Sequence, residues 1–419
     1  MIVVRLALKS LANRWLTVLL TVIAIALSVM LLLGVEKVRV GARQSFADTI
    51  SGTDLIVGAR TGSLQLLLYS IFRIGNATNN ITWASYDEIR RQPEVAWAVP
   101  LSLGDSHRGF RVLGTTPDYF LHYRYRRTHA LGFAAGKPFA DLFDAVVGAE
   151  VAQALGYKVG DRIVVAHGLG SVSFVEHGDK PFHVSGVLER TGTPVDRTVH
   201  VSLAAIEAIH VDWQGGAQVP GQSVSADEVR KLDLAPKAIT AALLGLKSKL
   251  ATFKLQRAIN DYPREALAAI IPGAALQELW GLVGVAETAL SAVSWMVVAT
   301  ALLGLATMIL TTLNERRREM AILRAVGARP ATVIGLLTAE AGLLTLAGVL
   351  LGLALTYLGL LVARPLIDRL YGLHLAIDPP TWGEMTTLAV IVAAGLLAGL
   401  VPALRAYRLS LADGMTVRT

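Results

Sequence analysis

Residues 15–35 of this sequence read WLTVLLTVIAIALSVMLLLGV, without a single charged side chain. A helix needs about 20 such residues to cross the hydrocarbon core of a bilayer. Comparable apolar runs predict three further spans, over residues 288–313, 331–363 and 385–404. The sequence therefore predicts an α-helical membrane protein with four transmembrane helices, one near the start of the chain and three after a long intervening segment.

The composition supports a membrane protein and excludes several other classes. Of the 419 residues, 53% are hydrophobic and 17% are charged, and the mean hydropathy is +0.52. These values lie outside the usual range of soluble chains. The apolar content excludes a disordered chain, and the absence of cysteine excludes both a disulfide-stapled module and cysteine chemistry. The net charge of +7 then indicates contact with the membrane surface rather than with nucleic acid.

The Lys and Arg residues beside the apolar runs predict the orientation. By the positive-inside rule, the short flanks richest in basic residues are cytoplasmic. These flanks are residues 1–14, 314–330 and 405–419, and their basic residues are Arg5, Lys9, Arg14, Arg316, Arg317, Arg318, Arg324, Arg329, Arg405, Arg408 and Arg418. We therefore expect both termini in the cytoplasm, and residues 36–287 and the short loop 364–384 in the periplasm.

The two flanks of the first span differ in what they suggest. Residues 1–14 place apolar side chains among three basic ones, a pattern typical of a short amphipathic helix at the membrane interface or of ordinary anchoring. On the opposite side, Lys37, Arg39 and Arg43 lie where the rule expects few basic residues. Glu36 and the large domain that follows reduce the weight of these three in the prediction.

The intervening residues 36–287 have the polarity of a soluble domain and alternate helix and strand signals, which predicts an α+β domain. Its length is enough for two subdomains. Within it, residues 64–74 read LQLLLYSIFRI. This segment is either a core helix or a surface that faces lipid or an apolar cargo. In the second case the contacting residues would be Leu66, Leu67, Leu68, Tyr69 and Phe72.

No motif in the chain predicts catalysis. The G-x-S-x-G, H-E-x-x-H and C-x-x-C patterns are absent, and residues 132–138 end in Gly-Lys-Pro without the spacing or the final Ser/Thr of a phosphate-binding loop. We therefore predict no catalytic residue and no cofactor bound by this chain. Any nucleotide must be bound by a partner.

Eight of the nine histidines lie in the predicted outer domain. They are His107, His122, His129, His167, His177, His183, His200 and His210. Imidazole is a common ligand of transition metals, but no two of these residues have H-x-H or H-x-x-x-H spacing. We therefore predict no metal site and interpret them as dispersed surface or hydrogen-bonded histidines, while an accessory role in zinc uptake stays open as an alternative.

Inside the predicted third span, Glu340 is costly in hydrocarbon unless it faces the helix bundle or pairs with a base. We expect it to have a packing or capping role rather than to relay protons. Small residues at Gly348-x-x-x-Gly352 and Gly395-x-x-x-Gly399 allow helices to approach closely. Packing within the chain explains them, and a dimer face is the alternative.

The segment Asn314 to Arg329 reads NERRREMAILRAVGAR and predicts a short helix with one apolar and one charged face. Such a helix docks in a groove of a cytoplasmic partner or lies on anionic lipid headgroups.

With this segment, three blocks of the sequence resemble the MacB/FtsX/LolC family of ABC-transporter permeases, also called type VII. The first is LALKSLANR over residues 6–14, the second is the run ending LRAVGAR at residues 323–329, and the third is PALRAYRLSLAD at residues 402–413. The resemblance covers nearly the whole chain, but this sequence has no fused ATPase and no match to the hook of LolC.

The resemblance implies two permease chains, here a homodimer, with two copies of a separate ABC ATPase that binds ATP and Mg²⁺. It further implies that the cytoplasmic segment contacts the ATPase, and that the first two spans extend outward as stalks. The coupling residues would be Glu315, Arg316, Arg317, Glu319, Leu323, Arg324, Gly327 and Arg329. Such permeases lie in the bacterial inner membrane and work by mechanotransmission, with membrane lipids and in some cases a periplasmic adaptor or substrate-binding protein as further partners.

Our leading functional hypothesis is a non-enzymatic permease subunit that drives efflux or extraction of an amphipathic substrate, such as a lipoprotein, lipid, peptide or drug-like molecule, from the periplasm or the outer leaflet. The alternatives are an FtsX-like signalling scaffold that regulates a periplasmic partner and the accessory role in zinc uptake.

Overall fold

The structure is a computed structural model that describes residues 14–126, 128–168, 179–214, 217–218, 224–315, 328–371 and 377–408. These residues form two compact units. We call the first, made of the described residues up to 41, within 284–366 and from 377 on, the bundle unit. The second, made of the described residues within 42–283 and 367–371, we call the sheet unit.

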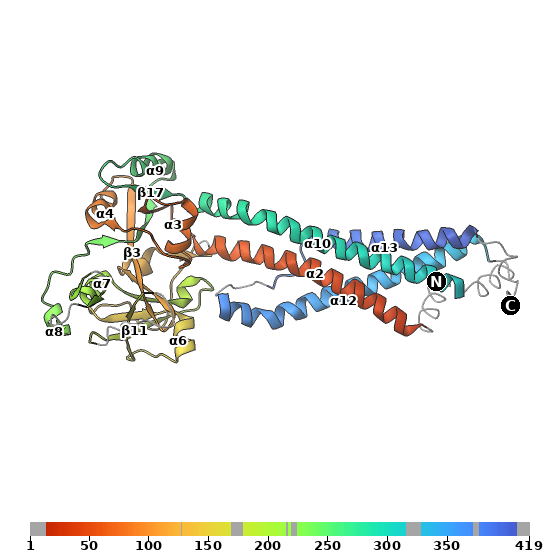
Figure 1. Ribbon diagram of the computed structural model, residues 1–419, viewed down its shortest axis with the longest axis horizontal. Helices are drawn as coiled ribbons and strands as arrows, with labels where there is room; N and C mark the ends of the chain where they lie inside the picture. Colours follow the sequence, from red (N-terminus) through yellow and green to blue (C-terminus); the bar gives the residue numbers. More distant parts are fainter. Residues whose placement is uncertain are drawn as a thin grey trace. The chain divides into compact units, whose positions relative to one another are not determined.

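Four long helices supply the bundle unit, and each carries a stretch long and apolar enough to cross a membrane, as predicted. They are α2 (Trp15–Thr49), α10 (Pro272–Glu315), α12 (Pro330–Tyr371) and α13 (Trp382–Arg408). Their parts in the bundle unit lie alongside one another (Figure 1) and share an apolar core to which all four contribute. Members of this core include Ile25, Val29, Leu302, Leu305, Leu337, Leu344, Leu388 and Ile391.

The helices are longer than the apolar runs. α2 continues beyond residue 35 to Thr49, and α10 begins at Pro272 rather than near residue 288. Among the described residues of the predicted loop 364–384, those up to Tyr371 belong to α12, which continues through Pro365, and those from Trp382 belong to α13. Charged residues end a stretch that suits hydrocarbon, but Arg, Glu and Lys are good helix formers and do not end a helix.

One mixed sheet organises the sheet unit. Its main path runs β17-β1-β16-β3-β4-β12-β8-β11-β7, with β10 on β3 and β9 on β11. The β4–β12 and β8–β11 pairs are parallel, and the other pairs are antiparallel. The bounds are β1 Leu55–Ala59, β3 Val95–His107, β4 Phe110–Thr115, β7 Phe133–Gly136, β8 Asp144–Val147, β9 Arg162–Ile163, β10 Ala166–His167, β11 Phe182–Leu188, β12 Thr198–Ser202, β16 Ala241–Leu246 and β17 Leu267–Ile270.

Short helices cover this sheet. They are α3 Ser63–Ser70, α4 Trp83–Arg90, α5 Asp118–His122, α6 Ala149–Leu155, α7 Leu203–His210, α8 Ala226–Val229 and α9 Thr252–Asn260, with 3₁₀ turns at Pro194–Arg197 and Lys249–Ala251. Two-residue strands pair at the margins, β2 (Ile81–Thr82) with β15 (Ala238–Ile239), β5 (Arg124–Tyr125) with β6 (His129–Ala130), and β13 (Trp213–Gln214) with β14 (Ala217–Gln218). In Figure 1, α4 and α9 lie toward the β17 side of the unit, and α6 and α7 lie toward β11.

The core of the sheet unit follows from alternation along its strands. β11 alternates buried and half-exposed or exposed positions, whereas β1 in the interior of the sheet is buried at every position. The buried side chains form three apolar clusters on the faces of one continuous sheet. A mixed sheet with covering helices agrees with the expected combination of helices and strands, while the prediction of two subdomains is not confirmed.

Candidate functional site

The predicted ATPase-coupling segment lies mostly outside the described residues. The predicted coupling residues outside the described part of the chain are Arg316, Arg317, Glu319, Leu323, Arg324 and Gly327. The structure describes Glu315 as the last residue of α10 and Arg329 as an exposed residue just before α12. The two helices thus end and begin at the limits of this segment, and the role of its residues stays a prediction.

The apolar segment 64–74 is a core element of the sheet unit. Its first part forms α3, in which Leu66, Leu67 and Tyr69 are buried, and Phe72 is buried just after it. Leu68 is partly buried and packs against the same cluster. This burial favours the core-helix interpretation, because side chains that fill a core are not available to lipid or cargo. The same burial raises the pKa of Tyr69 to about 12.

Glu340 lies in α12, in the bundle unit, and only 5% of it is exposed. The next residue, Ala341, is part of the bundle core. A carboxylate in this position faces other helices rather than lipid, as expected for a polar residue inside a membrane span.

Both glycine pairs lie where helices of the same chain approach one another. A methyl group added at Gly348 would come within 2.6 Å of Ile25, and one added at Gly352 would come within 2.7 Å of the Ala26 carbonyl oxygen. The pair in α13 lies against α12, since an added methyl at Gly395 would overlap Thr345 and one at Gly399 would overlap Ala341. Glycine at these sites lets α12 approach α2 and α13.

The basic residues that opposed the predicted orientation have acidic or aromatic partners. The ammonium group of Lys37 lies 3.1 Å from the carboxylate of Glu384, at the start of α13, and donates to the carbonyl oxygen of Asp378. Arg39 pairs with Glu36 at 2.6 Å. A paired charge is less costly near a membrane than a single one, which explains why these cations are tolerated there.

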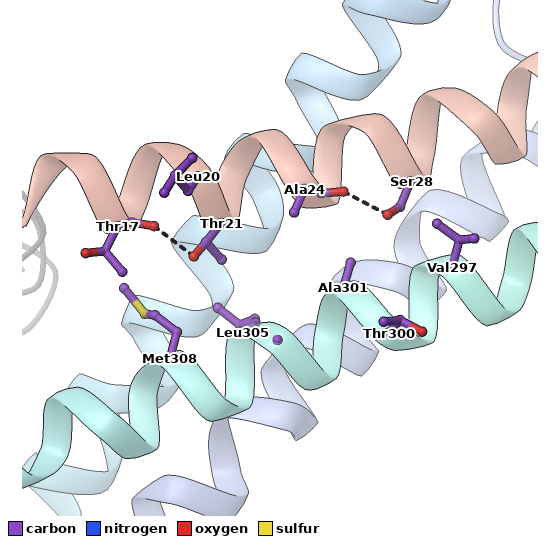
Figure 2. A pocket seen from close by; sticks show the side chains of 11 residues that line it. Thr17, Leu20, Thr21, Ala24, Ser28, Val297, Thr300, Ala301, Leu305 and Met308 are labelled. Atoms are coloured by element: carbon purple, nitrogen blue, oxygen red, sulfur yellow. Dashed lines mark hydrogen bonds between the residues drawn. The ribbon is translucent and has the colours of Figure 1, made fainter.

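A groove of about 480 Å³ lies between α2 and α10 in the bundle unit. Figure 2 shows Thr21 and Ser28 of α2 on one wall and Ala301 and Met308 of α10 on the other. Both hydroxyl groups donate to carbonyl oxygens one turn earlier in α2, Thr21 to Thr17 and Ser28 to Ala24. With these two hydroxyls bonded to the backbone and with Leu20, Ala24, Val297, Ala301, Leu305 and Met308 in its lining, the groove presents a largely apolar surface.

The sequence analysis missed one group of side chains. Asp105, His167 and His210 lie together in the sheet unit, although 62 residues separate Asp105 from His167 and 43 residues separate His167 from His210. No local spacing rule detects such a group, because only the pairing of β3 with β10 and the end point of α7 bring it together. His167 and His210 are therefore not dispersed, although both are hydrogen-bonded as the sequence interpretation allowed.

Two other histidines are buried by ordinary packing. His107 lies between the carbonyl oxygen of Val164, at 2.6 Å, and the hydroxyl of Tyr157, at 2.9 Å. His200 is fully buried against the rings of Tyr119 and Phe120. Burial lowers the pKa of His200 to about 3, so its imidazole is neutral at physiological pH.

Comparison with known proteins identifies the family. Residues 18–242, more than half of the chain, match the MacB-like periplasmic core domain, and residues 291–411 match the FtsX-like permease C-terminal domain. No curated protein matches the chain.

Two solved structures are similar. The periplasmic region of MacB from Actinobacillus actinomycetemcomitans has 11% identity and a TM-score of 0.34, with 55% of this chain and 94% of that chain covered. The extracellular domain of the noncanonic ABC-type transporter YknZ from Gram-positive bacteria has 12% identity and a TM-score of 0.31, with 52% and 99% covered. The two domain matches follow one another along the sequence, and the chain carries four apolar helices. The chain therefore belongs to the MacB/FtsX-type family of ABC transporter permeases.

Proposed function

We propose that this chain is the permease subunit of an ABC transporter that converts ATP hydrolysis in a separate ATPase into movement of the sheet unit. That movement drives efflux or extraction of an amphipathic substrate from the periplasm or the outer leaflet. Membership of the family supports an ABC ATPase as the partner. The active assembly would contain two permease copies and two ATPase copies, with ATP and Mg²⁺ bound by the ATPase.

The observation that carries this proposal is the length of α2 and α10. α2 has 35 residues and α10 has 44, so at 1.5 Å per residue they are about 52 Å and 66 Å long. The hydrocarbon core is only about 30 Å thick. Each helix therefore has several turns to spare, and each passes without a break from residues of the bundle unit to residues of the sheet unit. A continuous helix suits the transfer of displacement along its axis.

The proposed orientation puts the sheet unit in the periplasm and both termini in the cytoplasm. The segment between α10 and α12, with its five arginines, would then lie beside the ATPase. Within this segment we expect Arg324 to contribute most to coupling, because it lies in the run LRAVGAR, residues 323–329, that resembles the family's block.

The coupling proposal is tested by co-expression with candidate ATPases and reconstitution into liposomes. We expect an ATPase subunit to co-purify and Arg324→Glu to lower ATPase turnover in the complex. Arg405→Glu is the matched control, since it reverses an exposed arginine at the end of α13, outside the segment. Failure of every ATPase to co-purify, or equal turnover in the two variants, would contradict the proposal.

The stalk role of α2 has its own test. Gln44 is exposed in α2, and proline there would break the helix at a cost of about 3 kcal/mol. We expect Gln44→Pro to retain ATPase turnover but to lose release of a labelled amphipathic substrate, whereas Gln44→Ala keeps both. Activation of a periplasmic partner enzyme without release of substrate from the wild type would instead support a scaffold.

A further inference from the structure

The group formed by Asp105, His167 and His210 is built on regular secondary structure. Asp105 lies in β3, and His167 lies directly opposite it in the antiparallel partner β10. Residues opposite one another in such a pair present their side chains on the same face. His210 is the last residue of α7, which packs against β3. Two strands and a helix therefore fix the three side chains.

The spacing of their polar atoms matches one face of a tetrahedral metal site. Nδ1 of His167 lies 3.2 Å from Oδ1 of Asp105 and 3.1 Å from Nε2 of His210, and Nε2 of His210 lies 3.5 Å from that oxygen. Zinc binds imidazole nitrogen and carboxylate oxygen at about 2.0–2.1 Å, so tetrahedral geometry separates the ligand atoms by about 3.3 Å. One ion can thus reach all three atoms with little movement.

The orientation of His210 is also that of a metal ligand. Its Nδ1 lies 2.8 Å from the carbonyl oxygen of Ile206, and a carbonyl can only accept, so Nδ1 donates the hydrogen. When the ring is neutral, Nε2 carries the lone pair and faces Asp105 and His167. A backbone carbonyl that holds the second nitrogen in this way is a common outer-shell partner of metal-bound histidine.

The carboxylate of Asp105 is ionised and buried at the base of the group. Burial raises its pKa, but hydrogen bonds from His167 and His210 outweigh this and lower the pKa to about 2. Burial lowers the pKa of His210, but Asp105 and the carbonyl of Ile206 more than offset this effect and raise it. The buried negative charge favours a cation beside it.

The group is open to solvent on the histidine side. The side chain of His167 is 41% exposed and that of His210 is 25% exposed, against 4% for Asp105. Among the described residues the group has these three members. Two imidazoles and one carboxylate are a ligand set suited to zinc and related first-row ions, and three protein ligands leave a fourth position for water or an external ligand.

We propose that Asp105, His167 and His210 bind one divalent transition-metal ion of the zinc class, with the fourth position left to water or to a ligand from outside the chain. The site belongs to the sheet unit alone and does not depend on ATPase coupling. It joins the end of α7 to the β3–β10 pair.

The full chain in detergent, stripped with a chelator, provides the test. Calorimetric titration with ZnCl₂ should show one ion bound per chain, and CoCl₂ should produce the visible absorption bands of a tetrahedral cobalt site. His167→Gln and His210→Gln should each weaken zinc binding by more than about 100-fold, because even the outer-shell partners of metal ligands contribute about 10–100-fold. Both variants should abolish the cobalt bands.

His129→Gln is the matched control, because His129 is an exposed outer histidine in β6, outside the group. It should bind zinc as the wild type does. Because the side chain of His167 is well exposed, His167→Gln should fold, and it decides the outcome if His210→Gln prevents folding. Absence of zinc binding by the wild type, or equal binding by His167→Gln and His129→Gln, would overturn the proposal and leave a hydrogen-bonded cluster only.

Discussion

The two units each contain an ion pair between a lysine and a carboxylate, but the pairs differ in how far water is excluded. In the sheet unit, Lys180 lies 3.0 Å from Asp212, and neither side chain is exposed. In the bundle unit, Lys37 lies 3.1 Å from Glu384, with 12% and 9% of the side chains exposed. Lys180 also lies 2.9 Å from Asp179, whose side chain is 37% exposed, so Asp212 is the partner that is fully buried. The bundle instead has its pair where α2 meets the start of α13, and its apolar core contains side chains from all four long helices. The difference teaches that removing a partner should be most damaging where no water can replace it.

The largest effect should follow from Lys180→Met, which leaves the buried carboxylate of Asp212 without its lysine. Loss of one member of a buried pair costs about 3–5 kcal/mol. The control is Arg230→Met, which removes an exposed pair with Asp141 and should cost less than about 1 kcal/mol. Hydrogen exchange of sheet-unit peptides under increasing urea measures both. Equal losses in the two variants would show that burial does not set the strength of these pairs.

A smaller effect is expected from Lys37→Met, about 2 kcal/mol, because residual exposure lets water reach Glu384. The neighbouring Arg39→Met is the control. Arg39 and Glu36 are much more exposed, and the second pair of Arg39, with Glu287, is longer at 3.9 Å, so the loss of both should be nearly neutral. Thermal unfolding of the purified chain in detergent compares the two. A cost for Lys37→Met as large as that for Lys180→Met would remove the distinction between the units.

The close packing of the bundle is tested by two alanine substitutions in the same helix, α12. Gly352→Ala places a methyl group against α2 and should cost about 1.5 kcal/mol through overpacking. Gly335→Ala meets nothing within 4 Å and should stabilise the helix by up to about 1 kcal/mol. The two melting temperatures should therefore move in opposite directions. A shift of the same sign would mean that helix propensity, rather than helix contact, dominates both sites.

The smallest effect concerns acid stability of the sheet unit. Because burial lowers the pKa of His200 to about 3, the unfolded chain binds this proton near pH 6.5 and the folded chain does not. Stability therefore rises with pH across this window and falls as the pH is lowered below about 6.5. Between pH 6.5 and 5.5, the free energy of unfolding should fall by about 1 kcal/mol less in His200→Phe than in the wild type. Unfolding of wild type and variant at both pH values measures the difference, and parallel losses would contradict a neutral buried imidazole.

The sequence predicted the parts of the molecule that depend on local composition. Uncharged runs located all four long helices, because each residue that lies in the hydrocarbon core of a bilayer must itself be apolar. The uncharged runs did not predict where α2 and α12 end, since charge stops membrane burial without stopping a helix, and only the family resemblance implied that the first two spans extend outward. The sequence also left open whether the segment of α3 is core or surface, which depends on the strands that cover it.

Contacts between distant residues were beyond reach from the sequence alone. The group of Asp105, His167 and His210 depends on the register of β3 with β10, and a shift of one residue would turn His167 to the other face of the sheet. The pairing of Lys37 with Glu384 likewise depends on which helices are neighbours. Both arrangements join residues whose own neighbourhoods in the chain give no sign of a partner.

The position of β1 in the sheet affects how the protein folds during its synthesis. β1 is the first strand to be made, yet its two neighbours are β16 and β17, with Ile56 opposite Leu243 on one side and Ile270 on the other. During synthesis both edges of this apolar strand stay unpaired until nearly the whole unit has been made. Pairings so distant in sequence are slow to form and vulnerable to aggregation. Chaperone protection of the nascent chain should therefore matter more here than for the helices, which fold as they emerge.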